Sequence, residues 1–240
     1  MAEEKTALIT GANKGIGFET ARQLGKLGFR ILLGARDGDR GRISAAALEK
    51  EGIHAEFILL DVTNQRTIDD AAGVIGRNYG SLDVLINNAA IYIDGGDPPS
   101  RIPLSVLKET FETNFFGVFA VTTAMLPLLR KSPAGRIVNV SSGQGSLTRN
   151  SSPNTSSLLQ LAYNSSKSAL NALTIQFARE FRDSSLKINA AAPGFTATDM
   201  NQGRGTRTVR QASVVIVRLA TLDERGPSGG FFEDSGEVPW

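Results

Sequence analysis

Short apolar runs alternate with stretches of helical periodicity along almost the whole chain, and this alternation limits its fold more than any other feature. Strands are expected over residues 6–10, 29–33, 57–60, 82–86, 136–140, 186–190 and 229–232. Helices are expected over residues 15–27, 43–51, 65–79, 104–130, 158–182 and 206–222. Nearly continuous apolar strands, each followed by a helix, are typical of a parallel sheet with helices on both faces. The pattern predicts a doubly wound α/β fold.

No linker interrupts this alternation, so residues 1–240 are expected to form a single domain. Pro127 is expected to end or kink the helix over residues 104–130 near its end. Residues 143–154 are rich in Ser, Asn, Gly and Thr and show no periodicity, which predicts a loop. Long loops in compact domains are often functional.

The chain has no cysteine and a single histidine, His54. This composition excludes disulfides, cysteine-ligated metals, iron–sulfur clusters and thiol nucleophiles, and we expect no metal site. A hydrolase triad is excluded as well, because no serine stands in a G-x-S-x-G turn and His54 is misplaced for the role, so it is expected to be structural. The chemistry must therefore use oxygen and amine side chains.

The charges predict neither a nucleic-acid nor a membrane partner. Lys+Arg 26 against Asp+Glu 24 gives a net charge of +2, and the basic residues are scattered rather than clustered. The N-terminus has no basic leader, and no apolar run approaches the roughly 18 residues of a membrane span. We expect a soluble, cytoplasmic protein, in keeping with the lack of cysteine.

A glycine-rich turn, Thr10-Gly11-Ala12-Asn13-Lys14-Gly15-Ile16-Gly17, joins the first expected strand to the first helix. In a parallel sheet such a turn presents unpaired helix N–H groups, and its glycines let a pyrophosphate approach the backbone. The alternative is a tight turn that only packs the helix on the strand. The residues expected to contact a cofactor here are Gly11, Asn13, Lys14, Gly15, Ile16 and Gly17.

The spacing of this turn resembles the TGxxxGxG cofactor turn of the short-chain dehydrogenase/reductase family. Further motifs of that family follow in order at the ends of the expected elements: Asp61-Val62, Asn87-Asn88-Ala89-Ala90, Asn114, Ser141-Ser142, Tyr163 with Lys167, and Pro193-Gly194. Ala90 departs from the pattern, which more often has glycine there. The resemblance implies a Rossmann fold whose parallel sheet has about seven strands.

Tyr163 and Lys167 are four residues apart on an expected helix, so they share one face. A nearby ammonium lowers the pKa of a phenol, which is ordinarily about 10. The resemblance implies that Tyr163 protonates a carbonyl oxygen as hydride reaches the carbon, while Lys167 holds the nicotinamide ribose and tunes Tyr163. It also implies that Ser142, favoured over Ser141 by register, steadies the developing alkoxide, and that Asn114 orders a water next to Lys167.

The cofactor is expected to be NADPH/NADP. Where an NAD enzyme places an acid after its second strand, this chain has Ala35 followed by Arg36. Arg36 and Lys14 together suit a 2′-phosphate, and the NADP-preferring carbonyl reductases of the family carry such a pair. The alternative is that both cations are solvated surface charges and that Asp37 binds the ribose.

The same resemblance implies more cofactor contacts, at Asp61, Val62, Asn88, Pro193, Gly194, Thr196 and Thr198. Thr196 would bind the nicotinamide carboxamide through its backbone, and Thr198 would bind the carboxamide or a phosphate. Residues 199–207 would form a substrate lid, and Gly203 and Gly205 predict that this lid is mobile.

The segment between Ser142 and Tyr163 is longer than in common family members and shorter than in the family's monomeric carbonyl reductases. It leaves both a monomer and a homo-oligomer open, with residues 162–181 as the expected dimer contact. The resemblance implies a small carbonyl or alcohol substrate: ketones, aldehydes or quinones of modest size. The pocket is expected to be mainly apolar, with Tyr92, the loop around Leu147 and Phe195.

Together these features predict an NADPH-dependent carbonyl reductase. An NAD-linked alcohol or sugar dehydrogenase is a first alternative, and a non-catalytic NADP-sensing protein is a second. The presence of Tyr163, Lys167 and Ser142 together argues against the second.

Overall fold

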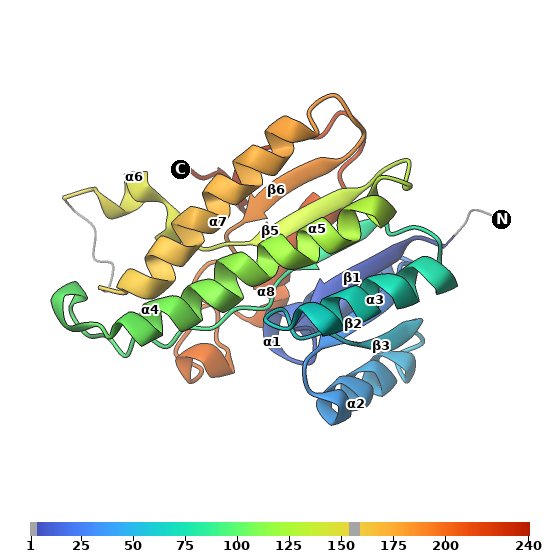
Figure 1. Ribbon diagram of the computed structural model, residues 1–240, viewed down its shortest axis with the longest axis horizontal. Helices are drawn as coiled ribbons and strands as arrows, with labels where there is room; N and C mark the ends of the chain where they lie inside the picture. Colours follow the sequence, from blue (N-terminus) through green and yellow to red (C-terminus); the bar gives the residue numbers. More distant parts are fainter. Residues whose placement is uncertain (1–3, 154–158) are drawn as a thin grey trace.

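The computed structural model describes residues 4–153 and 159–240 (Figure 1). Its strands are β1 Thr6–Thr10, β2 Arg30–Ala35, β3 Ala55–Leu59, β4 Val84–Asn87, β5 Arg136–Val140, β6 Lys187–Ala191, β7 Phe231–Glu233 and β8 Gly236–Glu237. In the described part of the chain these form one eight-stranded sheet in the order β3-β2-β1-β4-β5-β6-β7-β8. The pairs from β3 to β7 are parallel, whereas β7 and β8 are antiparallel.

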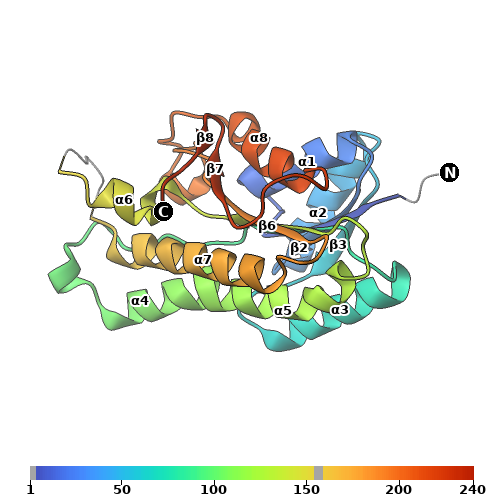
Figure 2. The same cartoon turned by 90° about the horizontal axis from the view of Figure 1, so that it is seen from above.

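Helices cover both faces of the sheet (Figure 2). They are α1 Gly15–Lys26, α2 Gly38–Glu49, α3 Gln65–Asn78, α4 Leu104–Phe111, α5 Gly117–Leu129, α6 Leu147–Asn150, α7 Leu161–Glu180 and α8 Val209–Ala220. In Figure 2, α1, α2 and α8 lie above the sheet, and α3, α4, α5 and α7 lie below it. The doubly wound α/β prediction is therefore confirmed.

Two apolar cores explain why the strands are almost continuously hydrophobic. Successive residues of a strand point to opposite faces of a sheet. Along β1, Leu8 belongs to the core shared with α3, α5 and α7, whereas Ile9 belongs to the core shared with α1 and α8. Leu32 and Ile31 on β2 divide in the same way. Each face must be covered, so helices are needed on both sides.

Helix α2 begins at Gly38, five residues before the expected start at Ile43. The side chain of Asp37 accepts hydrogen bonds from the backbone N–H groups of Asp39 and Arg40, at 3.1 and 3.0 Å, and so caps the helix. The first turn of α2 carries no apolar residue, so periodicity alone could not reveal it. Because β2 extends to Ala35, Arg36 directly follows the strand.

The expected helix over residues 104–130 is continuous from α4 to α5, but residues Glu112–Phe116 between them form a π-helical segment. Pro127 lies two residues before the end of α5 and does not end it. In the described residues, the run Leu104–Leu129 is long and apolar enough to cross a membrane by length and composition, which the sequence analysis did not anticipate. Buried core helices pass the same test, and Figure 2 shows this run packed in the lower helical layer.

The stretch expected to be a loop over residues 143–154 contains two short helices. Residues Gly143–Gly145 form a 3₁₀ turn and α6 follows, capped by the Ser146 hydroxyl, which accepts from the Arg149 N–H at 3.1 Å. A single helical turn is too short to show a period of 3.6 residues. Asn154 and the expected helix start at Leu158 lie outside the described residues; α7 begins at Leu161.

Candidate active site

A cleft of about 1060 Å³ lies where the parallel strands end. Segments that follow β1 to β6 line it, on both sides of the point between β1 and β4 where the order of strands reverses. Ligands bind at such a switch point in open α/β sheets. The expected cofactor-binding residues all line the cleft: Gly11, Asn13, Lys14, Gly15, Ile16, Gly17, Arg36, Asp61, Val62, Asn88, Tyr163, Lys167, Pro193, Gly194, Thr196 and Thr198. Ser142 lines it as well, and Asn114 does not.

The glycine-rich turn is tightly folded against the segment after β4. Gly11 and Gly15 have φ values of 61° and 60°, which L-residues rarely adopt. A β-carbon on Gly17 would lie 2.5 Å from the side-chain nitrogen of Asn88 and 2.8 Å from the carbonyl oxygen of Gly11. Asn88 in turn donates to the carbonyl oxygen of Thr10 at 2.8 Å. At these glycines no side chain covers the backbone of the turn, which therefore lies open to the cleft.

The N-terminus of α1 suits an anion. Lys14 is its N-cap residue and makes no capping hydrogen bond through its side chain, and the first turn carries no acidic residue. The positive end of the helix dipole and its first N–H groups thus face the cleft with no carboxylate in the first turn of the helix to compensate them. This donor set fits the pyrophosphate of a dinucleotide.

Two cations, Arg36 and Lys14, lie where the adenosine end of the cofactor is expected to bind. Arg36 is exposed and forms no ion pair within residues 4–153 and 159–240. Lys14 Nζ lies 2.8 Å from Asp199 Oδ2, so it bridges the glycine-rich turn and the segment expected to be the lid. Asp37, the alternative ribose ligand, uses its Oδ1 to cap α2, and the hydrogen bond from the Arg40 N–H chiefly lowers its pKa.

Tyr163 and Lys167 lie one turn apart on α7. Lys167 Nζ is 5.7 Å from the centroid of the Tyr163 ring and donates to the carbonyl oxygen of Val140 at 2.8 Å. Lys167 is 2% exposed, and this burial lowers its pKa to about 8. Tyr163 is half-buried at the cleft; desolvation raises its pKa, a hydrogen bond with Ser142 lowers it, and the charge of Asp94 raises it.

The two serines after β5 face different surroundings. Ser141 is buried, and its hydroxyl donates to Asn171 Oδ1 on α7 at 2.6 Å. Ser142 lies next to Tyr163, and its Oγ accepts from the Gln144 N–H at 3.2 Å. The Ser141 hydroxyl is thus committed to helix packing, whereas the Ser142 hydroxyl can act on a group beside Tyr163.

Asn114 lies behind the cleft, in the π-helical segment, and is fully buried. Its Oδ1 accepts from the Ile91 N–H at 2.8 Å, and its Nδ2 donates to the Ile91 carbonyl at 3.0 Å and to Ser166 Oγ at 3.1 Å. The side chain therefore joins the segment after β4 to α7. π-Helical turns are frequent at functional sites.

The segment after β6 folds back on itself. The hydroxyl of Thr196 donates to the Gly194 carbonyl at 3.0 Å, and Asn201 Nδ2 donates to the Thr196 carbonyl at 2.8 Å. Thr196 also forms a parallel bridge with Arg207, which closes the expected lid at its base. Residues 199–207 thus form a hydrogen-bonded loop that includes the 3₁₀ turn Asp199–Asn201.

The expected substrate end differs in part from the sequence analysis. Tyr92 and Phe195 line the cleft, whereas Leu147 is 66% exposed and does not. Gln144 and Gln160, which the sequence analysis missed, line it instead, and Gln160 Nε2 donates to the Tyr92 hydroxyl at 3.0 Å. Two amide side chains therefore join the apolar ones at this end of the cleft, and the loop around Leu147 contributes through Gln144. Gln144 could have been predicted from its position in the sequence, because it is only two residues after Ser142.

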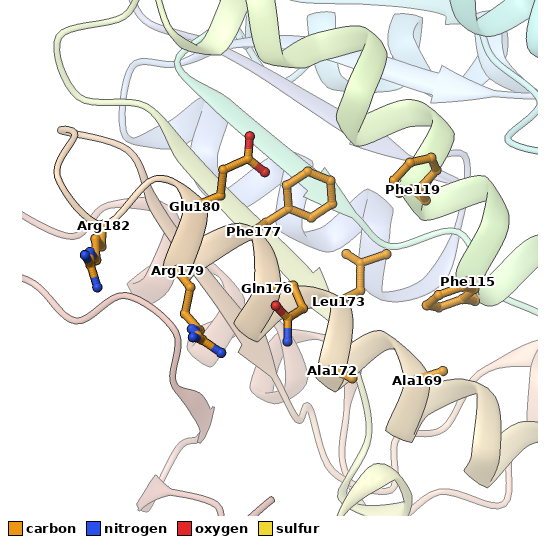
Figure 3. A pocket seen from close by; sticks show the side chains of 10 residues that line it. All are labelled: Phe115, Phe119, Ala169, Ala172, Leu173, Gln176, Phe177, Arg179, Glu180 and Arg182. Carbon is orange, nitrogen blue, oxygen red and sulfur yellow. The ribbon is translucent and has the colours of Figure 1, made fainter.

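His54 lies away from the cleft, just before β3, with its Nδ1 2.6 Å from Glu4 Oε1. A second groove, of about 750 Å³, lies between α5 and α7 (Figure 3). Phe119, Leu173 and Phe177 line it, beside Arg179 and Glu180, and no expected catalytic or cofactor-binding residue does. It lies along α7, within residues 162–181, which are expected to form the dimer contact.

The short chain dehydrogenase family matches residues 5–208 of this chain, which include the glycine-rich turn, Tyr163 and Lys167. The chain belongs to this family. As a short-chain dehydrogenase it is an oxidoreductase, and its relatives include carbonyl reductases. Enzymes of this family use a nicotinamide cofactor, which fits the cleft described above.

The short-chain dehydrogenase anuI of Penicillium roqueforti is 37% identical over 222 residues, covering 89% of this chain and 87% of that protein. Carbonyl reductase [NADPH] 3 of Rattus norvegicus is 33% identical over 277 residues, covering 98% of each chain. The crystal structure of NADPH-bound carbonyl reductase from chicken fatty liver superposes with a TM-score of 0.87 at 27% identity, covering 99% of this chain and 100% of that one. This short-chain dehydrogenase is thus similar to carbonyl reductases over its whole length.

Proposed function

We propose that this protein is an NADPH-dependent carbonyl reductase that converts ketones, aldehydes or quinones of modest size to alcohols. The observation that carries the proposal is that Tyr163, Lys167 and Ser142 meet in one cleft with a glycine-rich turn and the exposed Arg36. The similarity to carbonyl reductases whose names include NADPH supports reduction as the direction of the reaction and NADPH as the cofactor.

The residues of the cleft divide between the parts of NADPH. The glycine-rich turn and the first N–H groups of α1 hold the pyrophosphate, and Arg36 with Lys14 contacts the 2′-phosphate. Asp61 and Val62 flank the adenine, and Asn88 fixes the turn by its bond to Thr10. Residues 193–198 hold the nicotinamide through Thr196 and Thr198, with Lys167 on the nicotinamide ribose. The reduced nicotinamide supplies the hydride.

Tyr163 protonates the oxygen of the substrate. Its hydroxyl donates a hydrogen bond to the carbonyl, and its proton is transferred as the oxygen gains negative charge. Ser142 donates to the same oxygen and stabilises the developing alkoxide. The ammonium form of Lys167 favours the phenolate that Tyr163 leaves behind. Asn114 acts behind Lys167, where it is proposed to order a water that returns the proton.

Residues 1–240 form one domain, and the loop over residues 199–207 acts as its substrate lid. The ion pair between Lys14 and Asp199 holds this lid against the glycine-rich turn. Phe195 and Met200, exposed by 57% and 42%, give the substrate an apolar wall. We also place the protein in the cytoplasm, because it has no cysteine that disulfides could use.

The test is a panel of ketones, aldehydes and quinones, with NADPH and NADH oxidation followed by absorbance. The proposal predicts turnover of at least one carbonyl class, with NADPH preferred. Tighter binding and faster turnover with NAD and an alcohol or sugar would instead identify an NAD-linked dehydrogenase. Tight NADPH binding without turnover of any compound would identify a sensing protein.

A further inference from the structure

We propose that Asp94 is a positioning residue for catalysis, which fixes the start of the helix that carries Tyr163 and holds a negative charge beside that tyrosine. The inference rests on the proposed role of Tyr163 as proton donor. Asp94 lies in the segment after β4, far from α7 in the sequence. No family motif and no sequence pattern described above includes it.

The carboxylate of Asp94 caps α7 from outside the helix. Its Oδ2 accepts from the Ala162 N–H at 2.7 Å, and its Oδ1 accepts from the Tyr163 N–H at 3.0 Å. The residue that precedes α7, Gln160, makes no capping hydrogen bond with its side chain. The first N–H groups of a helix have no partner within it, so Asp94 satisfies two that would otherwise be unpaired. One of these belongs to Tyr163 itself.

The charge of Asp94 has no cation opposite it. The residue is 2% exposed, and among the residues that the structure describes it forms no ion pair with Lys, Arg or His. The N–H groups and the positive end of the α7 dipole stabilise it instead. An asparagine or serine can also cap a helix. What distinguishes the carboxylate is therefore its charge, which acts on Tyr163.

The groups that face Tyr163 act in opposite directions. Lys167 on α7, when charged, favours the phenolate. The hydrogen bond between Tyr163 and Ser142, which follows β5, lowers the pKa of Tyr163. Desolvation and the charge of Asp94 raise it. From the segment after β4, the Tyr92 ring lies edge-on, with its centroid 5.6 Å from that of the Tyr163 ring. Desolvation chiefly, and the charge of Asp94 in addition, thus favour the protonated hydroxyl, which is the form that a proton donor needs.

The test compares the titration of Tyr163 in four variants of the full chain. Asp94→Asn and Asp94→Ser both keep an acceptor for a helix N–H and lose the charge, whereas Asp94→Glu keeps the charge with a longer side chain. Asp97→Asn is the matched control, since Asp97 is an exposed carboxylate of the same segment. Tyrosinate absorbance is followed against pH, and the same variants carrying Tyr163→Phe are subtracted to isolate Tyr163.

We expect the Tyr163 phenolate to form at lower pH in both neutral variants, and at the wild-type pH in Asp97→Asn and Asp94→Glu. The neutral variants should also lose about 2–4 °C in Tm, because the interaction of the Asp94 charge with the positive end of the α7 dipole is lost. A Tyr163 titration unchanged in the neutral variants, with the loss in Tm alone, would overturn the proposal and leave Asp94 a structural cap. So would an equal shift in Asp97→Asn.

A second measurement is the pH profile of NADPH-dependent reduction. The loss of activity at high pH should begin at lower pH in Asp94→Asn and Asp94→Ser than in the wild type, and an unmoved profile contradicts the proposal. The absorbance titration needs no turnover. If the wild type reduces no carbonyl compound, the proposed function fails, while the titration still decides the electrostatic role of Asp94.

Discussion

The side-chain nitrogen of Lys167 donates a hydrogen bond to the backbone carbonyl of Val140 at 2.8 Å, and this bond joins the middle of α7 to the end of β5. Both residues line the cleft. The bond holds an amine at a place where burial lowers its pKa to about 8. A cation here is therefore unfavourable for the fold, as expected if Lys167 has the catalytic role proposed for it.

Lys167→Met should stabilise the protein while it abolishes reduction. The pKa of Lys167 is about 8 in the folded protein and 10.5 ordinarily. Below pH 8 the charged amine of Lys167 is therefore less favourable in the folded state than in the unfolded state, which destabilises the fold. The variant should raise the unfolding free energy at pH 7 by about 1–3 kcal/mol. Because the cost disappears as pH rises from about 8 to 10.5, the gain should shrink over that window. Urea unfolding at pH 7 and at pH 10 measures this, and an equal gain at both contradicts the buried charge.

Tyr163→Phe should lower the rate of carbonyl reduction by about 10²–10⁴-fold, because the proton donor is lost. The binding of NADPH should change little, since the ring and its contact with Tyr92 remain. Steady-state kinetics and a fluorescence titration of NADPH measure the two effects separately. Tyr92→Phe is the matched control. Unchanged turnover in Tyr163→Phe would exclude the assigned acid.

Arg36→Ala should weaken NADPH binding by about 1–3 kcal/mol, because a charged hydrogen-bond donor to the 2′-phosphate is lost. NADH lacks that phosphate and should bind as before. Arg40→Ala is the control, since Arg40 is a neighbouring exposed cation paired with Asp37. Calorimetric titration with both cofactors measures the difference. Equal losses for NADPH and NADH would place Arg36 elsewhere on the cofactor.

Gly145→Ala should destabilise the protein by about 1–3 kcal/mol and lower kcat. A β-carbon on Gly145 would lie 2.9 Å from the backbone carbonyl carbon of Lys167, so α7 or the turn must move. At Gly143 the nearest atom is the flexible end of Arg149, at 3.3 Å, and Gly143→Ala should be tolerated. Thermal unfolding and kinetics of both variants test this. Similar effects at the two positions would show that the contact with α7 is unimportant.

Much of the fold could be predicted from the sequence, because β1, β2, β4, β5 and β6 are buried on both faces and are therefore mostly apolar. Ile31 and Leu32 must point to opposite cores, and that requirement makes β2 continuously apolar. The shortest helices and strands could not be predicted from the sequence, for a physical reason. The four residues of α6 form one turn, and β8 is a two-residue strand that exists only through its pairing with β7.

The candidate site was predictable where it depends on local spacing. Tyr163 and Lys167 share a helix face, and Arg36 follows the end of a strand. Contacts between distant segments could not be foreseen. The bond by which Asp94 caps α7 joins residues that are 68 positions apart, Asp94 and Ala162. The bond to Asn171 on α7 that distinguishes the Ser141 hydroxyl from the Ser142 hydroxyl also joins distant segments. The periodicity of a sequence gives no information about contacts between such distant residues.

The most direct test of the central claim is a crystal structure of the protein with NADP⁺ and a carbonyl compound or its alcohol product. The account predicts that the nicotinamide lies beside α7, with the Tyr163 hydroxyl and Ser142 both within hydrogen-bond distance of the substrate oxygen. The hydride-carrying ring carbon should face the carbon of that same carbonyl. A nicotinamide bound with this carbon turned away from the Tyr163 hydroxyl would contradict the account.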